Sequence, residues 1–186
     1  MNIRKYSLFP TLILYFPKFI ASKECNKIFK LLKTKPHDVH PTLIKGKSSH
    51  NTNLNILSQT SLDFTKAIQE YSKESKIKIQ NKITNSWFNI QSKGSVLKEH
   101  SHPNSVISGA LFINVDFKSS KLYFHNPNPF IYYMDTEDSV SEYTQEWYSF
   151  NPEIGDLILF PSWLRHGSNH DKNFSTNRAV ISFNTL

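Results

Sequence analysis

Three histidines in this sequence have the spacing expected of a metal site. His100 and His102 lie two residues apart in the stretch "VLKEHSHPNSVISGALF", directly ahead of a run that is typical of a buried strand. Residues two apart on an extended strand point to the same face, so both imidazoles could reach one ion. His166 follows the apolar run "GDLILFPSWL". Three protein ligands leave positions open on a metal, as catalysis requires.

Each of these histidines also has a simpler interpretation. A single histidine is often a hydrogen-bonded polar residue, and the chain has eight histidines, so a pair can arise by chance. His166 could cap a loop, and His170 lies close behind it as a competing imidazole. The metal site is therefore a hypothesis that requires all three histidines to converge.

Arg178 and Ser182 could bind an anion. Arg178 begins the last predicted strand, "RAVISFN", and Ser182 lies four residues later on the same face. An arginine binds a carboxylate through two parallel hydrogen bonds, and its burial is costly unless it meets an anion. Together the two side chains could hold the far carboxylate of a dicarboxylic acid. The alternative is an exposed arginine in a surface ion pair.

Two helices are expected in the first part of the chain. Residues 22–33 have apolar residues at helical spacing, with Ser22 as the N-cap. Residues 60–75 place a second apolar stripe on one face, and Thr60 with Asp63 resembles a capping box.

The rest of the chain is expected to form strands and loops. Residues 35–58 are polar and predict irregular structure. From residue 83, short runs rich in Val, Ile, Phe, Tyr and Trp alternate with turn residues, which predicts an antiparallel sandwich or barrel. The fold class is thus mainly β with N-terminal helices (α+β). The long polar loop at 126–145 could be a lid or disordered.

Composition narrows the possible settings and partners. The net charge is +7, but the lysines are scattered, so a nucleic-acid partner is a minority interpretation. Cys25 is the only cysteine, which excludes a disulfide within the chain and favours a reducing, cytoplasmic location. Pro10 and Pro17 interrupt the apolar N-terminal segment, which is too short for a membrane helix. We expect that segment to pair at a sheet edge.

Taken together, the motifs resemble those of the iron(II)/2-oxoglutarate-dependent oxygenases. The similarity covers about residues 83–186, with "GDLILFPSWLRH" as its most specific part. Within that superfamily, the motifs are similar to a group of 2-oxoglutarate–iron oxygenases related to the prolyl hydroxylases. It implies a double-stranded β-helix (jelly roll) with the metal at one open end. The expected organisation is a single domain over residues 1–186, with helical support at about 20–80 and the jelly-roll core at about 83–186.

The resemblance also implies roles for particular residues. His100 matches the first iron ligand, His166 matches the last, and Arg178 matches the arginine that binds the cosubstrate 2-oxoglutarate. The middle ligand is usually Asp or Glu, whereas this chain has His102. Imidazole suits iron, so a three-histidine site is chemically sensible. Asn104 or Asp116 are alternatives for this position.

The implied enzyme is a dioxygenase that hydroxylates its substrate and releases succinate and CO2. Its substrate would be a small molecule or a protein, and neither its identity nor the oligomeric state follows from the sequence. Trp87, Asn89, Tyr123 and Trp163 are candidate pocket walls, although core packing is the simpler role for the aromatic residues. Two other functions stay open: a non-catalytic jelly-roll binding module, and a cupin-like three-histidine metal enzyme that does not use 2-oxoglutarate.

Overall fold

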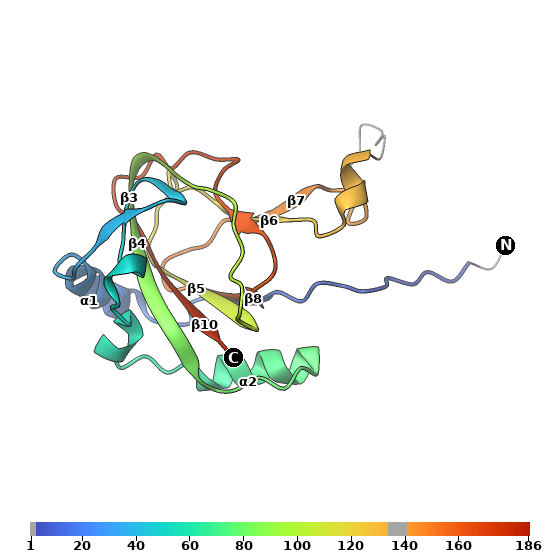
Figure 1. Ribbon diagram of the computed structural model, residues 1–186, viewed down its shortest axis with the longest axis horizontal. Helices are drawn as coiled ribbons and strands as arrows, with labels where there is room; N and C mark the ends of the chain where they lie inside the picture. Colours follow the sequence, from blue (N-terminus) through green and yellow to red (C-terminus); the bar gives the residue numbers. More distant parts are fainter. Residues whose placement is uncertain (1–2, 134–140) are drawn as a thin grey trace.

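The protein is built on two antiparallel sheets with two helices outside them (Figure 1). The computed structural model describes residues 3–133 and 141–186. The large sheet has the order β1-β8-β5-β10-β4-β3-β2, and the small sheet has the order β7-β6-β9. The strands are β1 (Leu14–Phe16), β2 (Asp38–His40), β3 (Leu43–Ser48), β4 (Ile83–Leu97), β5 (Ile107–Asn114), β6 (Leu122–His125), β7 (Trp147–Phe150), β8 (Leu157–Pro161), β9 (His166–Gly167) and β10 (Arg178–Thr185). This arrangement is the expected jelly roll.

The two expected helices form, but neither has the predicted N-terminal capping residue. Helix α1 spans Ser22–Leu32, and Ala21 rather than Ser22 is its N-cap. Helix α2 spans Thr65–Ser75, because the preceding chain forms the short 3-10 helix η2 (Ile56–Gln59) and an extended Thr60. The capping box from Thr60 is therefore wrong. Asp63 instead accepts a hydrogen bond at 2.8 Å from the backbone N–H of Thr65.

The helices cover the outer face of the large sheet. Ile28 of α1 and Ile68 of α2 belong to one apolar cluster with Leu111, Ile181 and Phe183 from β5 and β10. Fully burying one such side chain contributes about 1.5–3 kcal/mol. The side chains that alternate with these on β5 and β10 face the small sheet in a second apolar cluster. Both faces of the central strands are thus buried, which explains why their sequences are almost continuously apolar.

Gly109 shows how closely β5 and β10 pack. It lies directly opposite Phe183 in the strand register. A Cβ atom at position 109 would lie 2.2 Å from the Phe183 ring, which is closer than atoms can approach. The glycine therefore makes room for the ring, which packs against Phe64 with ring centroids 4.7 Å apart.

The N-terminal part of the chain also contributes strands to the large sheet. Strand β1 pairs with β8 at the sheet edge, which confirms the expectation for this segment. Strands β2 and β3 form a hairpin that pairs with β4, and η1 (His50–Thr52) follows it. The prediction of irregular structure over residues 35–58 is wrong here. The hairpin has few apolar residues because most of its side chains are exposed, so its alternation was hard to detect.

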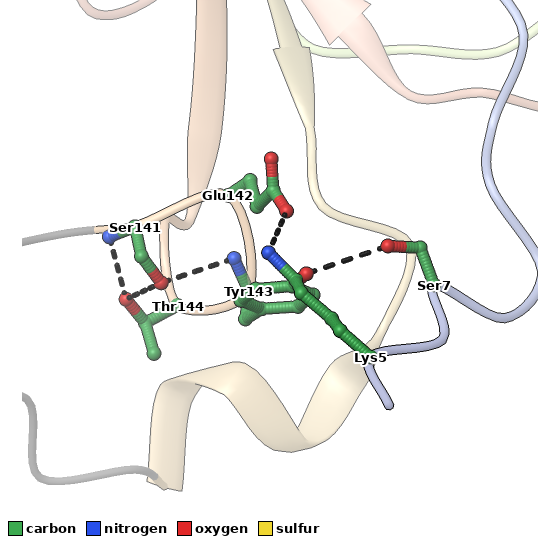
Figure 2. A network of polar contacts seen from close by, with 6 residues as sticks. All are labelled: Lys5, Ser7, Ser141, Glu142, Tyr143 and Thr144. Atoms are coloured by element: carbon green, nitrogen blue, oxygen red, sulfur yellow. Dashed lines mark hydrogen bonds and ion pairs between the residues drawn. The ribbon is translucent and has the colours of Figure 1, made fainter. Parts of the chain in front are cut away.

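The long polar loop at 126–145 is only partly described. It contains η3 (Pro129–Tyr133), and residues 134–140 lie outside the described ranges, so the expectation of a lid cannot be followed there. Its end contacts the extended N-terminal arm: Lys5 forms an ion pair with Glu142 at 3.1 Å, and Ser7 lies 3.3 Å from the hydroxyl of Tyr143 (Figure 2). No helix in the part of the chain seen here is long and apolar enough to cross a membrane.

Candidate active site

The three candidate histidines come together where the segment after β4 meets β9 and the end of β8. The ligand nitrogens of His100, His102 and His166 all lie within 4.8 Å of one another. The ring centroids are 4.4 Å apart for His100 and His166, and 5.1 Å apart for His100 and His102. Within the described ranges, these residues form the only group of three or more His, Cys, Asp or Glu side chains that is close enough to share a metal ion.

Backbone hydrogen bonds fix the segments that carry the histidines. His100 lies three residues after β4 and forms an isolated antiparallel bridge with His166 of β9. The N–H of each donates to the carbonyl of the other, at 3.0 and 2.9 Å. The His102 N–H donates to the carbonyl of Ser162, just after β8, at 2.8 Å. The small sheet and the end of β8 therefore hold all three residues in place.

Hydrogen bonds to Nδ1 orient two of the rings. The Nδ1 atom of His100 lies 2.8 Å from the carbonyl oxygen of Lys98, and that of His166 lies 2.8 Å from the carbonyl oxygen of Leu164. A carbonyl oxygen only accepts hydrogen bonds, so each Nδ1 must carry the proton. The lone pair is then on Nε2, which is the form that binds a metal.

The hydroxyl of Ser108, which has only one proton to donate, orients the ring of His102. The Nδ1 atom of His102 lies 2.7 Å from the hydroxyl of Ser108, and that hydroxyl donates to Oδ1 of Asn184 at 2.7 Å. Ser108 must therefore accept the hydrogen bond from His102, whose lone pair is also on Nε2. This Nε2 is buried and has no hydrogen-bond partner within the described chain, which fits a ligand atom that requires a metal.

Burial favours the neutral form of all three imidazoles. Desolvation, followed by repulsion from His100, lowers the pKa of His102 to about 4. Desolvation is also the main cause that lowers the pKa of His100 and that holds the pKa of His166 well below its ordinary value. Neutral imidazole is the form that coordinates a metal, so the three side chains are ready to bind at neutral pH.

No carboxylate belongs to this cluster among the residues described. Glu99 faces away from it, as the strand alternation predicts, and forms an ion pair with Arg165. Its other oxygen lies 3.4 Å from Nε2 of His125. Asp116 binds the hydroxyl of Ser175 at 2.9 Å and is not part of the histidine cluster. The cluster therefore consists of three neutral imidazoles.

Arg178 is buried in the same interior. Its side chain is only 4% exposed, and its Nε donates to the carbonyl of Ser120 at 3.1 Å. Its Nη1 donates to Oε1 of Gln91, which lies directly opposite on β4. Burial lowers the pKa of Arg178 to about 10, so the side chain is still charged at neutral pH. Within the ranges described, no carboxylate forms an ion pair with it.

Two cavities adjoin the histidines. The smaller one, of about 40 Å³, is lined by the three histidines and by Arg178 and Ser182, so it joins the predicted anion site to the predicted metal site. The larger one, of about 510 Å³, is also lined by His100 and His102. Five residues predicted from the sequence therefore lie around one interior space.

Gln91 is a site residue that the sequence analysis missed. It is 1% exposed and lines the smaller cavity. Its Oε1 accepts a hydrogen bond from Arg178, and its buried Nε2 has no hydrogen-bond acceptor in the described chain. The sequence could have indicated this role, because Gln91 follows Trp87 and Asn89 at steps of two and therefore lies on the same face of the strand. Trp87 and Asn89 do line both cavities.

Other side chains considered from the sequence lie elsewhere. Tyr123 and Trp163 line neither cavity, and Trp163 is exposed. His170 stacks on Trp147 with centroids 4.3 Å apart and does not belong to the histidine cluster. Asn104 lines the larger cavity.

Comparison with known proteins agrees with this geometry. The family model described as "Putative 2OG-Fe(II) oxygenase" matches residues 85–184, which include the three histidines and Arg178. A search of curated proteins gave no significant match.

Several solved structures share the fold at low sequence identity. HygX from Streptomyces hygroscopicus, with nickel and 2-oxoglutarate bound, is 11% identical with a TM-score of 0.63, over 93% of this chain and 82% of HygX. A prolyl-4-hydroxylase from Pseudomonas putida is 9% identical with a TM-score of 0.62, over 94% of this chain and 92% of that one. The 2-oxoglutarate-dependent epimerase SnoN is 8% identical with a TM-score of 0.65, over 95% of this chain and 76% of SnoN.

These likenesses establish the fold, and the family model carries the functional assignment because it spans more than half of the chain. The neutral histidine cluster and the buried arginine beside it fit the iron and the cosubstrate of that family. The chain belongs to the 2OG-Fe(II) oxygenase family, whose members are iron(II)- and 2-oxoglutarate-dependent dioxygenases.

Proposed function

We propose that His100, His102 and His166 hold the iron(II) ion of this dioxygenase. The observation that supports this assignment is the convergence of three Nε2 lone pairs, each fixed by a hydrogen bond at Nδ1. A site with three neutral ligands leaves the full charge of iron(II) uncompensated by the protein. An anionic cosubstrate would supply that compensation, which agrees with a chelating 2-oxo acid.

Arg178, Ser182 and Gln91 are the residues that we assign to 2-oxoglutarate. Arg178 offers a buried positive charge without a carboxylate partner in the described chain, and Gln91 offers an amide N–H without an acceptor. A carboxylate bound beside this pair could accept from the remaining guanidinium N–H groups of Arg178 and from the amide N–H of Gln91. The smaller cavity has room for about one water molecule. The cosubstrate would therefore also extend toward Trp87 and Leu97, which line both cavities.

The walls of this space suit a reaction that must exclude water. Phe112, Phe160 and Val180 line the smaller cavity and are buried, so they would shield the cosubstrate from solvent. When bound, iron(II) and 2-oxoglutarate supply the oxidising chemistry, in which O2 hydroxylates the substrate and 2-oxoglutarate is converted to succinate and CO2. The protein orients the cosubstrate through Arg178 and positions the substrate in the larger cavity.

The remaining assignments concern the setting of the enzyme. We place it in the cytoplasm, because its single cysteine, Cys25, is a buried free thiol. We treat residues 1–186 as one domain, because β1 and the β2–β3 hairpin belong to the same sheet as the strands after residue 83. The size of the larger cavity favours a small-molecule substrate.

A cupin-like enzyme that uses three histidines without 2-oxoglutarate is the second candidate, since the histidine cluster alone fits it. It has no use for the buried Arg178. The two candidates are separated by consumption of 2-oxoglutarate in air, measured as succinate. We expect the wild-type protein with iron(II) to form succinate slowly without substrate, and His166→Ala to form none. No succinate from iron-loaded wild-type protein with any tested substrate would favour the cupin-like candidate.

A further inference from the structure

The wall of the larger cavity lacks formally charged side chains. Fifteen residues of the described chain line it, and none is Lys, Arg, Asp or Glu. Charged residues make up 20% of the sequence, so about three would be expected in a set of this size. The net charge of +7 is therefore carried elsewhere on the protein. A charged ligand group would lose its hydration in this cavity without gaining a partner of opposite charge.

Polar groups that both donate and accept hydrogen bonds take the place of charges. The amides of Asn85, Asn89 and Asn104 line the cavity, together with the hydroxyls of Thr84 and Ser105. An amide side chain offers two N–H donors and one carbonyl acceptor, and a hydroxyl offers one donor and an acceptor. Among the described residues, the side chains of Asn89 and Asn104 have no hydrogen-bond partner, so both amides can form hydrogen bonds to a ligand.

A row of aromatic rings forms another part of the wall. His40 packs edge-on against His50 with centroids 4.7 Å apart, and His50 packs edge-on against Trp87 at 5.0 Å. Trp87 in turn contacts His102 at 5.3 Å. The row therefore leads from the β2–β3 hairpin to the histidine cluster. Its ring faces give the cavity flat aromatic surfaces beside its amides, which suit a ligand with both C–H and polar faces.

We propose that this cavity binds a neutral small molecule rich in hydroxyl or carboxamide groups, and that this molecule is the substrate of the oxygenase. The inference rests on the proposed function, because His100 and His102, two of the three proposed metal ligands, line the cavity. Hydroxyl and carboxamide groups both donate and accept hydrogen bonds, and neither carries a charge. A sugar and an uncharged amide are the two sources of that chemistry, and the volume of about 510 Å³ suits either.

Ligand-observed NMR with the protein loaded with Mn(II) and 2-oxoglutarate tests this inference. The probes are methyl glucoside with its charged analogues glucuronate and glucosamine, and N-acetylglycinamide with its acidic analogue N-acetylaspartate. Mn(II) broadens the resonances of molecules that bind near it. We expect Mn(II)-dependent broadening by at least one neutral probe, and at least tenfold weaker binding of its charged analogues. The set that responds identifies the sugar or the amide source.

Two substitutions assign the binding to this cavity. Asn89→Ala should reduce the affinity for the neutral probe about five- to tenfold, because the hydrogen bonds of the Asn89 amide are lost. Asn89→Asp should admit glucosamine, because it adds the missing opposite charge. Asn177→Ala is the matched control, since Asn177 is exposed and outside both cavities, and it should bind like the wild type. Circular dichroism checks that each variant is folded.

Other outcomes overturn the inference. Binding of a charged analogue as tight as that of its neutral probe would overturn it, and so would the absence of binding by both neutral probes. Equal affinities of the neutral probe for Asn89→Ala and wild type would place the binding outside this cavity. Failure of Mn(II) itself to bind would instead overturn the metal assignment on which the inference rests.

Discussion

His100 and His166 exchange both of their backbone hydrogen bonds, with N–O distances of 3.0 and 2.9 Å, although they lie far apart in the sequence. The pairing places their side chains on the same face of the bridge, where the ring centroids are 4.4 Å apart. Two of the three proposed ligands are thus fixed by the backbone. The ring of His102 is instead fixed by the side chain of Ser108.

The first prediction concerns His102, which stands where relatives usually have a carboxylate. His102→Ala should reduce iron(II) affinity at least a hundredfold, because one of three ligands is lost. His102→Asp should retain part of the affinity, because a carboxylate oxygen suits iron(II). Anaerobic iron titration measures both effects, and circular dichroism confirms folding. Iron binding close to wild type by a folded His102→Ala protein would show that His102 is not a ligand.

The second prediction separates cosubstrate binding from metal binding. Arg178→Ala should weaken 2-oxoglutarate binding at least a hundredfold, through loss of a bidentate charge-assisted interaction, and leave iron binding nearly unchanged. Gln91→Glu should weaken 2-oxoglutarate binding at least tenfold, because the new carboxylate would pair with Arg178 in place of the cosubstrate. Isothermal titration calorimetry of the metal-loaded protein measures both changes.

Gln91→Met is the matched control for that prediction, since it keeps the volume and adds no charge. It should weaken 2-oxoglutarate binding by about tenfold or somewhat more, from the loss of one hydrogen bond to a charged group, and by less than Gln91→Glu does. If Gln91→Glu binds 2-oxoglutarate as tightly as the wild type, the carboxylate of the cosubstrate does not bind Arg178 beside Gln91.

The parts of the site that depend on strand alternation could be predicted from the sequence. Arg178 and Ser182 share a face because they lie four residues apart on one strand, and both line the smaller cavity. The same rule suggested that His100 and His102 point together. The convergence of these two histidines with His166 and the burial of Arg178 could not be predicted from the sequence. Both depend on how β4, β9 and β10 are arranged in the fold.

Other features could not be predicted, because they result from contacts between distant segments. The role of Gln91 depends on its position opposite Arg178, and the register between β4 and β10 determines that position. His40 and His50 reach the larger cavity through a hairpin whose exposed polar residues indicated irregular structure. The N-cap of α1 lies one residue before the predicted Ser22, as expected for boundaries judged from local preference alone.

The third prediction concerns pH. Burial lowers the pKa of His102 from 6.5 to about 4, so the unfolded chain binds a proton at this residue at a higher pH than the folded protein does. The stability of the metal-free protein should therefore be complete above about pH 6.5 and should fall as the pH decreases toward 4. Urea denaturation at pH 7 and pH 5 measures this loss.

Two variants show whether the histidine cluster causes this loss. His102→Ala should reduce the difference in unfolding free energy between pH 7 and pH 5, because one of the three buried imidazoles is removed. His37→Ala should leave the difference unchanged, because His37 is exposed. An identical pH dependence in His102→Ala and wild type would contradict the proposed role of its burial.

The fourth prediction concerns Asp156, which is 1% exposed and attaches the N-terminal segment to β8. Its carboxylate accepts hydrogen bonds from the hydroxyl of Tyr15, from the N–H of Lys18 at 2.8 Å and from the N–H of Glu153 at 2.6 Å. Asp156→Ala should destabilise the protein by about 3 kcal/mol, since three donors lose their acceptor. Asp38→Ala, at an exposed position, should change stability by less than about 0.5 kcal/mol. Thermal denaturation that ranks the two variants equally would contradict this role.

The most direct test of the central claim is the visible absorption spectrum of the protein with iron(II) and 2-oxoglutarate under anaerobic conditions. If the three histidines hold iron and Arg178 holds the far carboxylate, the 2-oxo acid chelates the metal and a weak charge-transfer band appears. The band should require both additions, disappear in His166→Ala and require much more 2-oxoglutarate in Arg178→Ala. A wild-type protein that binds iron(II) but gives no band at saturating 2-oxoglutarate would contradict the account.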